Sequence, residues 1–324
     1  MVILYIFLAL IVLILINVPV AVALALVGTI ATFMTYGNMA MPTVGMTMFE
    51  GATNFPLIAI PLFILAGAIM NASSISRRLI DLAMAMVGFI KGGLAMVTIG
   101  ASVFFAEISG SAVAGVSAIG SILIPAMRKK GYSKEFAASI SSSAASLAII
   151  LPPSIPMILY AVMSGESVVQ MFVAGILPGL LGAMGLAAMC YYLARKNNFP
   201  SEGRFRVSQL WTAFKEAIWA LLIPVIILGG IFGGFVTATE GAALAVCVAI
   251  FISAVVYREF TIRNFIDSCK SAGVQTAVVM LLVAASAVVG GYLTETRVPQ
   301  EIAMQISELT NNKYLILALL NVIS

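Results

Sequence analysis

Long apolar runs, separated by short polar stretches, recur along the whole chain. They predict helices at 2–16, 19–36, 55–72, 168–194, 218–235, 241–257 and 274–293, and a further apolar start at Lys313. Most of these runs approach the roughly 20 residues with which a helix crosses the hydrocarbon core of a bilayer. A transmembrane β-barrel has short segments of alternating polarity instead. The pattern therefore predicts an all-α, polytopic membrane protein.

Two further apolar runs are interrupted in their middle by residues that break helices. Ser109-Gly110-Ser111 interrupts the run 92–127, and Pro152-Pro153-Ser154 interrupts the run 136–164. An unpaired backbone group in lipid is costly, so irregular backbone persists at membrane depth only where it is buried or lines a cavity. One such break alone is commonly a kink. Two breaks of different chemistry favour a binding site.

Composition supports the assignment to a membrane and narrows the chemistry. Of the 324 residues, 62% are hydrophobic and only 9% are charged, whereas soluble domains have about 25% charged residues. The net charge of +4 does not indicate nucleic-acid binding, because the basic residues lie between apolar runs. The absence of histidine excludes His-based catalysis and His metal ligands. Cys190, Cys247 and Cys269 are too widely spaced to indicate a metal or redox site.

The distribution of basic residues predicts the topology. Of the 17 Lys and Arg residues, 15 fall on one side of the predicted spans, and the positive-inside rule makes that side cytoplasmic. Basic residues flank 92–127 at both ends, so this segment enters and leaves on the same side. It is predicted to be a re-entrant hairpin, although two full spans with a tight turn remain an alternative. The same count places the N-terminus in the periplasm.

The order of elements predicts an inverted repeat, which is typical of secondary transporters. Segments 76–90 and 207–218 are amphipathic and predict helices in the membrane interface. The predicted division is scaffold helices at 1–72, an interfacial connector helix at 73–91, a transport region of hairpin and broken helix at 92–164, a scaffold helix and cytoplasmic loop at 165–206, second-repeat helices and a connector at 207–312, and the start of a second hairpin at 313–324. Because that hairpin stops soon after it begins, we expect the chain to be C-terminally truncated.

The two breaks suggest a site for a hard cation. Gly110 permits a tight turn, and Ser109 and Ser111 offer hydroxyl groups. Pro152, Pro153 and Pro156 lack an N–H, so they release the carbonyls of Ala148, Ile149 and Pro152 from helical hydrogen bonding. Ser146 and Ser154 can add hydroxyls. Neutral oxygen ligands suit Na⁺ better than a soft metal.

Several longer motifs resemble the large membrane (M) subunit of tripartite ATP-independent periplasmic (TRAP) transporters. They are FPLIAIPLFILAGAIM, RRLIDLAMAMVGFIKGGLAM, ISGSAVAGVSAIGSILIPAM, LPPSIPMILYA, FVAGILPGLLG and VTATEGAALAV. The resemblance covers nearly the whole chain. It implies an elevator-type, Na⁺-driven importer of organic acids, with a small four-helix membrane subunit and a periplasmic substrate-binding protein as partners.

In that family the hairpin tip and the Pro-Pro-Ser break form one sodium site and part of the substrate site. The resemblance thus assigns sodium binding to Ser109, Gly110, Ser111 and Pro152, and substrate contacts to Ser111, Pro153 and Ser154. The sequence departs from the family in lacking the second hairpin and second broken helix. It also has Ala238 where Pro is more usual and Gly241 where Ala is more usual.

Two acidic residues near the apolar segments are candidates for coupling or for structure. Glu107 lies two residues before the predicted tip, where it can tune cation binding or pair with a hydroxyl. Glu240 begins a helix that Thr237 or Thr239 can cap, which favours a structural role.

The sequence therefore predicts Na⁺-coupled uptake of a small organic anion across the bacterial inner membrane, with a carboxylate such as a C4-dicarboxylate or a sugar acid as solute. No catalytic residue, cofactor or metal other than the coupling ion Na⁺ is expected. No Lys or Arg lies in the middle of a membrane segment, so the solute's charge is expected to meet the helix N-termini at Ser111 and Ser154 or bound Na⁺. The alternatives are an ion or anion antiporter without partners and a polytopic membrane enzyme.

Overall fold

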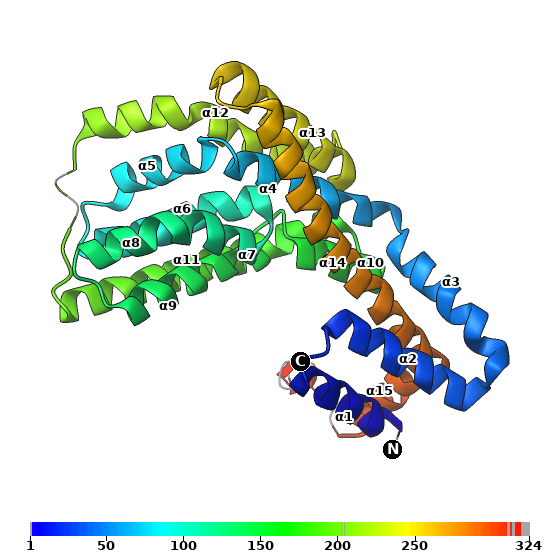
Figure 1. The fold of residues 1–324 in the computed structure, drawn as a ribbon. Coiled ribbons are helices and arrows are strands. Elements are labelled where there is room, and N and C mark those ends of the chain that lie inside the picture. The colour runs from blue at the N-terminus through cyan, green and yellow to red at the C-terminus, as the bar shows by residue number, and fades with distance from the viewer. Residues whose placement is uncertain (1, 202, 204, 310–311, 313–314, 319–324) are drawn as a thin grey trace. The chain divides into compact units, whose positions relative to one another are not determined.

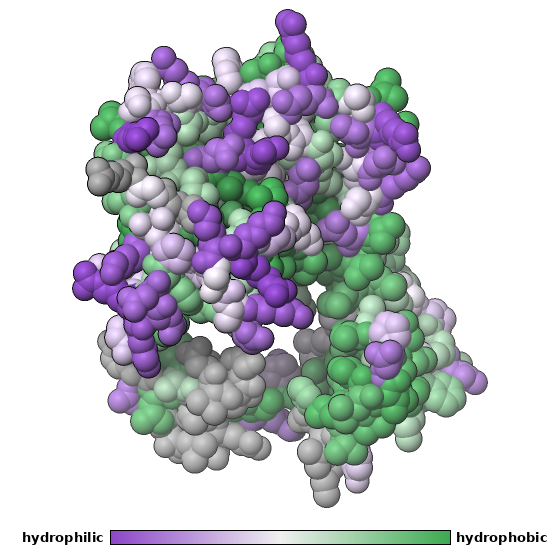
Figure 2. Space-filling model, turned by 60° about the vertical axis from the view of Figure 1, so that its left-hand side comes forward, coloured by the Kyte–Doolittle hydropathy of each residue, from purple (hydrophilic) through white to green (hydrophobic). Residues whose placement is uncertain are grey.

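The computed structural model describes residues 2–201, 203, 205–309, 312 and 315–318, and the side chains of 2–4, 107–109 and 305–309 are outside the description. The predicted start of a second hairpin at 313–324 therefore lies largely outside the described residues. Every described element is a helix, which confirms the predicted all-α fold. Figure 2 shows wide areas of apolar side chains on the surface, with polar side chains gathered in patches. Such a surface suits a protein surrounded by lipid.

The helices, in chain order, are α1 (Val2–Leu15), α2 (Val20–Tyr36), η1 (Asn38–Ala40), α3 (Met41–Ala52), η2 (Phe55–Ile58), α4 (Ala59–Asn71), α5 (Ile75–Val87), α6 (Gly93–Ser109), α7 (Ala112–Gly115), η3 (Val116–Gly120), α8 (Ser121–Lys129), α9 (Lys134–Ala145), η4 (Ser146–Ile149), α10 (Ile155–Ser164), α11 (Val168–Lys196), α12 (Val207–Phe232), α13 (Ala238–Phe251), η5 (Ile252–Val256), α14 (Ile262–Glu295) and α15 (Val298–Leu309) (Figure 1). The chain forms two compact units, of which the first comprises Met1–Thr53 with Ala277–Ser324 and the second comprises Asn54–Thr276.

The first unit packs around a small apolar core. Ile6 of α1, Val27 and Ala31 of α2, and Val289 and Tyr292 of α14 are its buried members. The Tyr292 hydroxyl lies 2.9 Å from that of Thr35. A Cβ on Gly28 would lie 2.9 Å from Val288 Cγ1, so the absence of a side chain lets α2 approach α14 closely.

The second unit stacks α12, α5, α6 and α9 so that each packs on the next (Figure 1). α13 packs along α4 through the small buried residues Ala242, Ala245 and Ala249, which let helix backbones approach. α5 is amphipathic, as the sequence predicts, and it buries Ile75, Leu79 and Leu82. It therefore lies as a packed layer between α6 and α12.

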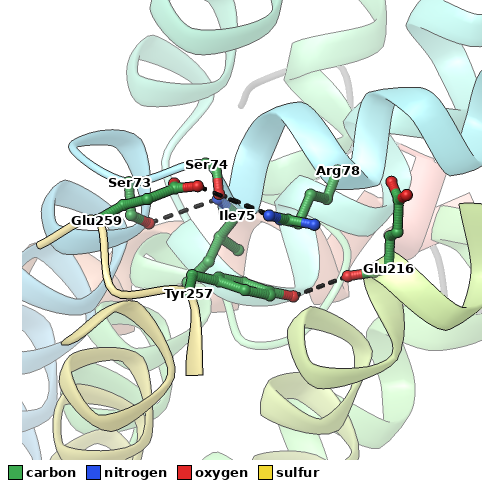
Figure 3. Close-up of polar contacts among 7 residues, drawn as sticks. All are labelled: Ser73, Ser74, Ile75, Arg78, Glu216, Tyr257 and Glu259. Carbon is green, nitrogen blue, oxygen red and sulfur yellow. Dashed lines mark hydrogen bonds and ion pairs between the residues drawn. The ribbon is translucent and has the colours of Figure 1, made fainter. Parts of the chain in front are cut away.

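An ionic and aromatic cluster links α5 to the residues that follow η5, and through Tyr257 to Glu216 of α12 (Figure 3). The Arg78 guanidinium lies over the Tyr257 ring, 4.1 Å from its centroid. It also forms an ion pair with Glu259 at 3.6 Å and donates from Nε to Ser74 Oγ at 3.1 Å. The Tyr257 hydroxyl donates to the carbonyl of Glu216 at 2.9 Å. Arg78 thus joins the connector helix to the segment that follows η5.

The structure corrects two boundaries that were predicted from the sequence and adds one helix. Segments 207–218 and 218–235 form one continuous helix, α12, because neither Trp211 nor Lys215 interrupts helical hydrogen bonding. α14 begins at Ile262 rather than near 274. A helix that the apolar pattern did not predict, α3, spans Met41–Ala52.

Among the described residues, five helices are long and apolar enough to cross a membrane, and the count is six if Asn38–Ala52 and Phe55–Asn71 together form one broken span. The five are the second arm of the hairpin at Ala112–Lys129, and Val168–Lys196, Val207–Phe232, Ala238–Val256 and Ile262–Glu295.

Candidate functional site

Two helical arms meet at a tip at Gly110, which both the re-entrant hairpin and the alternative of two full spans with a tight turn predict. α6 ends there, and Gly110 adopts φ +56°, which is in the left-handed region that glycine favours. Its N–H donates to the carbonyl of Ala106 at 3.2 Å. The second arm starts from Ser111, whose hydroxyl accepts from the N–H of Ala114 at 3.4 Å and so caps the arm. The two arms reverse direction over a single glycine.

The predicted broken helix is present as well. η4 ends at Ile149, and α10 begins at Ile155, with the Pro152–Pro153 peptide bond in cis. Ser154 is fully buried and caps α10 by accepting from the N–H of Met157 at 3.5 Å. Its hydroxyl donates to the carbonyl of Ile149 at 2.5 Å. Ser154 therefore bridges the two halves of the broken helix.

The tip and the break contact each other directly. The N–H of Ile155 donates to the carbonyl of Gly110 at 3.4 Å. A Cβ on Gly110 would lie 2.6 Å from the carbonyl oxygen of Pro153. The two interruptions thus form one junction of main-chain atoms.

A shared apolar core holds the junction in place. Phe105 of α6, Ile119 and Leu123 of the second arm, and Leu147 and Leu151 beside the break belong to one buried cluster. A Cβ on Gly115 would lie 3.6 Å from the Cβ of Ala145 and 3.8 Å from Phe105, so the arms pack on the broken helix through small residues. The broken helix and the hairpin are thereby packed as one body.

α11 supports the break from another side through two glycines four residues apart. A Cβ on Gly175 would lie 2.4 Å from the carbonyl oxygen of Ile150 and 2.3 Å from Met157 Cε, and a Cβ on Gly179 would lie 2.6 Å from Leu151. This spacing is the small-xxx-small pattern that lets membrane helices approach closely. Both glycines lie in the motif FVAGILPGLLG, and their four-residue spacing is the sequence signal for this close approach.

A polar cavity of about 500 Å³ lies beside the tip, between α4, the second arm of the hairpin and the first part of α14. Its polar lining residues are Asn71 of α4, Ser111 and Ser117 of the hairpin, and Asn264, Asp267, Ser268, Ser271 and Gln275 of α14. The five α14 residues follow the i, i+3, i+4, i+7 spacing of one helix face. This face lies in 258–273, between the predicted helices 241–257 and 274–293, so it was not predicted, although the spacing of its polar residues was the available signal.

The remaining predicted residues are not equally close to the junction. Ser146 is exposed and donates to the carbonyl of Ser143 at 2.8 Å, so its hydroxyl follows α9. Ala148 is buried between the hairpin and α11. The carbonyl of Ile149 already accepts from Ser154 and has a second lone pair. The side chains of Glu107 and Ser109 lie outside the described residues.

Glu240 forms a capping box with Thr237 at the start of α13. The Thr237 N–H donates to Glu240 Oε2 at 2.7 Å, and the Glu240 N–H donates to Thr237 Oγ1 at 3.3 Å. These bonds satisfy groups that a helix start leaves unpaired. Thr239 lies in the first turn and is buried, so the cap is Thr237. A Cβ on Gly241 would lie 2.9 Å from Ile231 Cδ1, so the absence of a side chain lets α13 approach α12 closely.

Comparison with known proteins gives a match along nearly the whole chain. Residues 7–324 match the family described as DctM, tripartite ATP-independent periplasmic transporter, DctM component. The chain is 40% identical over 298 residues to the isethionate TRAP transporter permease protein DctMQ of Oleidesulfovibrio alaskensis, in a match that covers 92% of this chain and 47% of that protein.

Two further relatives have similar identity. The C4-dicarboxylate TRAP transporter large permease protein DctM of Pseudomonas aeruginosa is 39% identical, with 100% of this chain and 75% of that protein covered. The 2,3-diketo-L-gulonate TRAP transporter large permease protein YiaN of Escherichia coli is 38% identical, with 83% and 64% covered. The chain thus spans about half to three quarters of the length of these relatives.

Proposed function

Because the chain belongs to the family of DctM components of tripartite ATP-independent periplasmic transporters, we propose that it carries out Na⁺-coupled uptake of a small organic acid across the bacterial inner membrane. A periplasmic binding protein delivers the acid, and a small four-helix membrane subunit completes the transporter. The relatives are named for isethionate, C4-dicarboxylates and 2,3-diketo-L-gulonate. These names support a small organic acid as solute for this chain.

The observation that carries the proposal is the contact between the hairpin tip and the Pro-Pro-Ser break. The carbonyl oxygen of Gly110, which accepts from Ile155, and that of Pro153, which faces the Gly110 Cα, both lie at this junction. Ser111 and Ser154 bring hydroxyl groups to the starts of the two helices that leave it. Neutral hard oxygens of this kind are the ligands that suit Na⁺. In our proposal one Na⁺ binds at the junction and stabilises the hairpin against the broken helix.

The solute's carboxylate then binds next to that ion. The second arm of the hairpin and α10 both begin at the junction, at Ser111 and Ser154, so their first N–H groups and their positive dipole ends lie there. Bound Na⁺ adds positive charge at the same place. Neither the ion nor the anion is stable there alone, because each neutralises the other in a site of low polarity. This mutual dependence is the coupling that drives uptake by the Na⁺ gradient.

The test is uptake as a function of Na⁺ concentration in the complete transporter, with the binding protein saturated. In Ser111→Ala we expect the loss of one hydroxyl ligand to cost about 1–3 kcal/mol, so the half-maximal Na⁺ concentration rises roughly 5- to 150-fold. Ser73→Ala is the matched control, since Ser73 lies in the connector before α5 and its hydroxyl donates to the carbonyl of Met70. Uptake that does not depend on Na⁺ in the unsubstituted transporter would refute the proposal.

A further inference from the structure

The polar cavity beside the tip has an unusual charge for a protein that imports organic anions. Its described lining contains one carboxylate, Asp267, together with the amides of Asn71, Asn264 and Gln275, and includes no Lys or Arg. Asp267 is exposed. A carboxylate in a recess attracts cations and repels anions more strongly than it does on an open surface. The cavity therefore favours a cation over the anionic solute.

The lining is also chemically uniform. Every polar group that α14 and the hairpin bring to the cavity is an oxygen or an amide, from Ser111, Ser117, Asp267, Ser268, Ser271 and the two α14 amides. These are the hard ligands of an alkali cation, and none is a soft metal ligand. The Ser268 hydroxyl donates to the carbonyl of Ala68 at 3.4 Å, and Asn71 Oδ1 accepts from Ser76 at 3.2 Å. The first bond links the α14 wall to α4, and the second holds the Asn71 side chain of α4 against α5.

The position of α14 in the chain indicates on which side of the membrane the cavity lies. The polar face Asn264–Gln275 follows the basic residues Arg258 and Arg263, which the positive-inside rule places in the cytoplasm. Away from this face, α14 exposes apolar residues, including Ile266 at 47% and Val274 at 67%. Arg263 and Lys270 are also exposed on α14, beside Asp267, but neither lines the cavity, so Asp267 is the charged residue that α14 brings to it.

We infer that this cavity is the aqueous route by which the coupling cation moves between the hairpin tip and the cytoplasm, with Asp267 holding the cation on the way. The inference rests on the proposed function for the identity of the cation as Na⁺. Ser111 lines the cavity and also caps the second arm at the junction, so the route begins at the proposed sodium site. Asp267 lowers the barrier to release by offering the ion a negative charge as it leaves the oxygens of the tip.

The charge selectivity is tested with cysteine reagents that need no knowledge of the solute. Ser117→Cys places a thiol in the cavity, in a variant whose Cys190, Cys247 and Cys269 are replaced by Ala. Its rates of reaction with a cationic and an anionic methanethiosulfonate of similar size are measured in inside-out membrane vesicles. Ser208→Cys, exposed at the start of α12, is the reference thiol on the same predicted side.

We expect the ratio of cationic to anionic rates to be higher for Ser117→Cys than for Ser208→Cys. Adding Asp267→Asn should lower the ratio for the thiol at position 117 by about 5- to 10-fold. This is the effect of one unit charge acting over roughly 6–9 Å of watery medium, counted for both signs, a separation that fits within a cavity of about 500 Å³. The effect must shrink at high salt as screening increases. Glu166→Gln, which removes a carboxylate from the loop after α10, must leave the ratio unchanged. An unchanged ratio in Asp267→Asn overturns the inference.

A second readout addresses the ion itself. Na⁺ inside proteoliposomes inhibits uptake by returning to the site through the cavity. We expect Asp267→Asn to raise the internal Na⁺ concentration that half-inhibits uptake by about 3-fold, because only the attraction of a cation is lost here. The dependence of uptake on external Na⁺ should stay the same. Equal changes on both sides would show that Asp267 belongs to the sodium site and not to a route. If uptake proves independent of Na⁺, the proposed function fails, whereas the reagent ratios still decide whether the cavity selects cations.

Discussion

At the scale of single residues, Gly110 is a position that tolerates no side chain without strain. Its φ of +56° is unfavourable for any residue with a side chain. A Cβ there would also lie 2.6 Å from the carbonyl oxygen of Pro153, which belongs to the backbone and cannot rotate away. Both effects push the tip away from the break.

We therefore expect Gly110→Ala to abolish Na⁺-dependent uptake while the protein still folds and inserts. Strain at one left-handed residue costs about 1–2 kcal/mol, which is small against the stability of the whole domain. Uptake and the yield of monodisperse protein are the measurements. Gly131→Ala is the control for left-handed strain alone, because Gly131 has φ +87° and no neighbouring atom within 4 Å of its Cβ position. Normal uptake by Gly110→Ala would show that the close contact at the tip is dispensable.

Tyr257 gives a residue-scale prediction about pH. Burial raises the pKa of its hydroxyl, and the neighbouring Arg78 only partly offsets this effect. The folded state therefore prefers the protonated phenol, so its contribution to stability is complete below the unfolded pKa of about 10 and is lost as pH rises through the folded value. We expect the melting temperature to fall as pH rises above about 10, and Tyr257→Phe to reduce that fall. An identical pH profile for Tyr257→Phe would contradict the assignment.

At the scale of elements, Arg78 holds α5 against Tyr257 and Glu259, just after η5, through ring and charge contacts, and Tyr257 in turn bonds to α12 (Figure 3). A partly buried cation–π contact contributes about 0.5–2 kcal/mol, and the exposed ion pair adds little. We expect Arg78→Ala to lower the melting temperature of the purified protein clearly more than Arg77→Ala, which removes the same charge from an exposed position on the same helix. Arg78→Lys should recover only part of the loss, because Lys lacks the planar group that stacks on Tyr257. Equal losses for Arg77→Ala and Arg78→Ala would mean that only the net charge of α5 matters.

Helix α11 illustrates how a close approach between elements depends on glycine. Gly175→Ala puts a methyl group 2.4 Å from the carbonyl oxygen of Ile150, so either α11 or the break must move. We expect a loss of stability of about 1–3 kcal/mol, in the range of overpacked cores, and a weaker response of uptake to Na⁺. Gly185→Ala on the same helix has open space at its Cβ position and should be neutral or slightly stabilising. A neutral Gly175→Ala would imply that α11 does not restrain the break.

The sequence predicted the elements whose signal is local and missed those whose signal depends on neighbours. The hairpin and the broken helix follow from Ser109-Gly110-Ser111 and Pro152-Pro153-Ser154, because Gly and Pro limit the backbone directly. Helix α3 was missed because its polar residues, such as Thr43 and Glu50, interrupt the apolar run. The early start of α14 was missed because Arg263 and Lys270 interrupt the apolar pattern, although both residues belong to the helix. The docking of tip on break needs the packing of distant segments, which no single stretch encodes.

At the scale of the whole molecule, the basic residues predict the orientation in the membrane, and this prediction has its own test. Lys129 ends the second arm of the hairpin, and Glu166 follows α10. In intact cells an impermeant thiol reagent should label Glu166→Cys and should not label Lys129→Cys unless the membrane is opened. Labelling of Lys129→Cys from outside would refute the predicted topology and with it the cytoplasmic side of the polar cavity.

The junction of tip and break is made of main-chain atoms, whereas the wall of the cavity is made of side chains on one face of α14. Side-chain substitutions can therefore change the cavity wall, whereas they change the junction only if they alter the backbone. A library that randomises Asn264, Ser271 and Gln275 changes the chemistry of the passage without rewriting the backbone contact at Gly110. Selection from such a library for uptake driven by another alkali cation would show how far the cation preference of the passage can be altered while the junction at Gly110 stays unchanged.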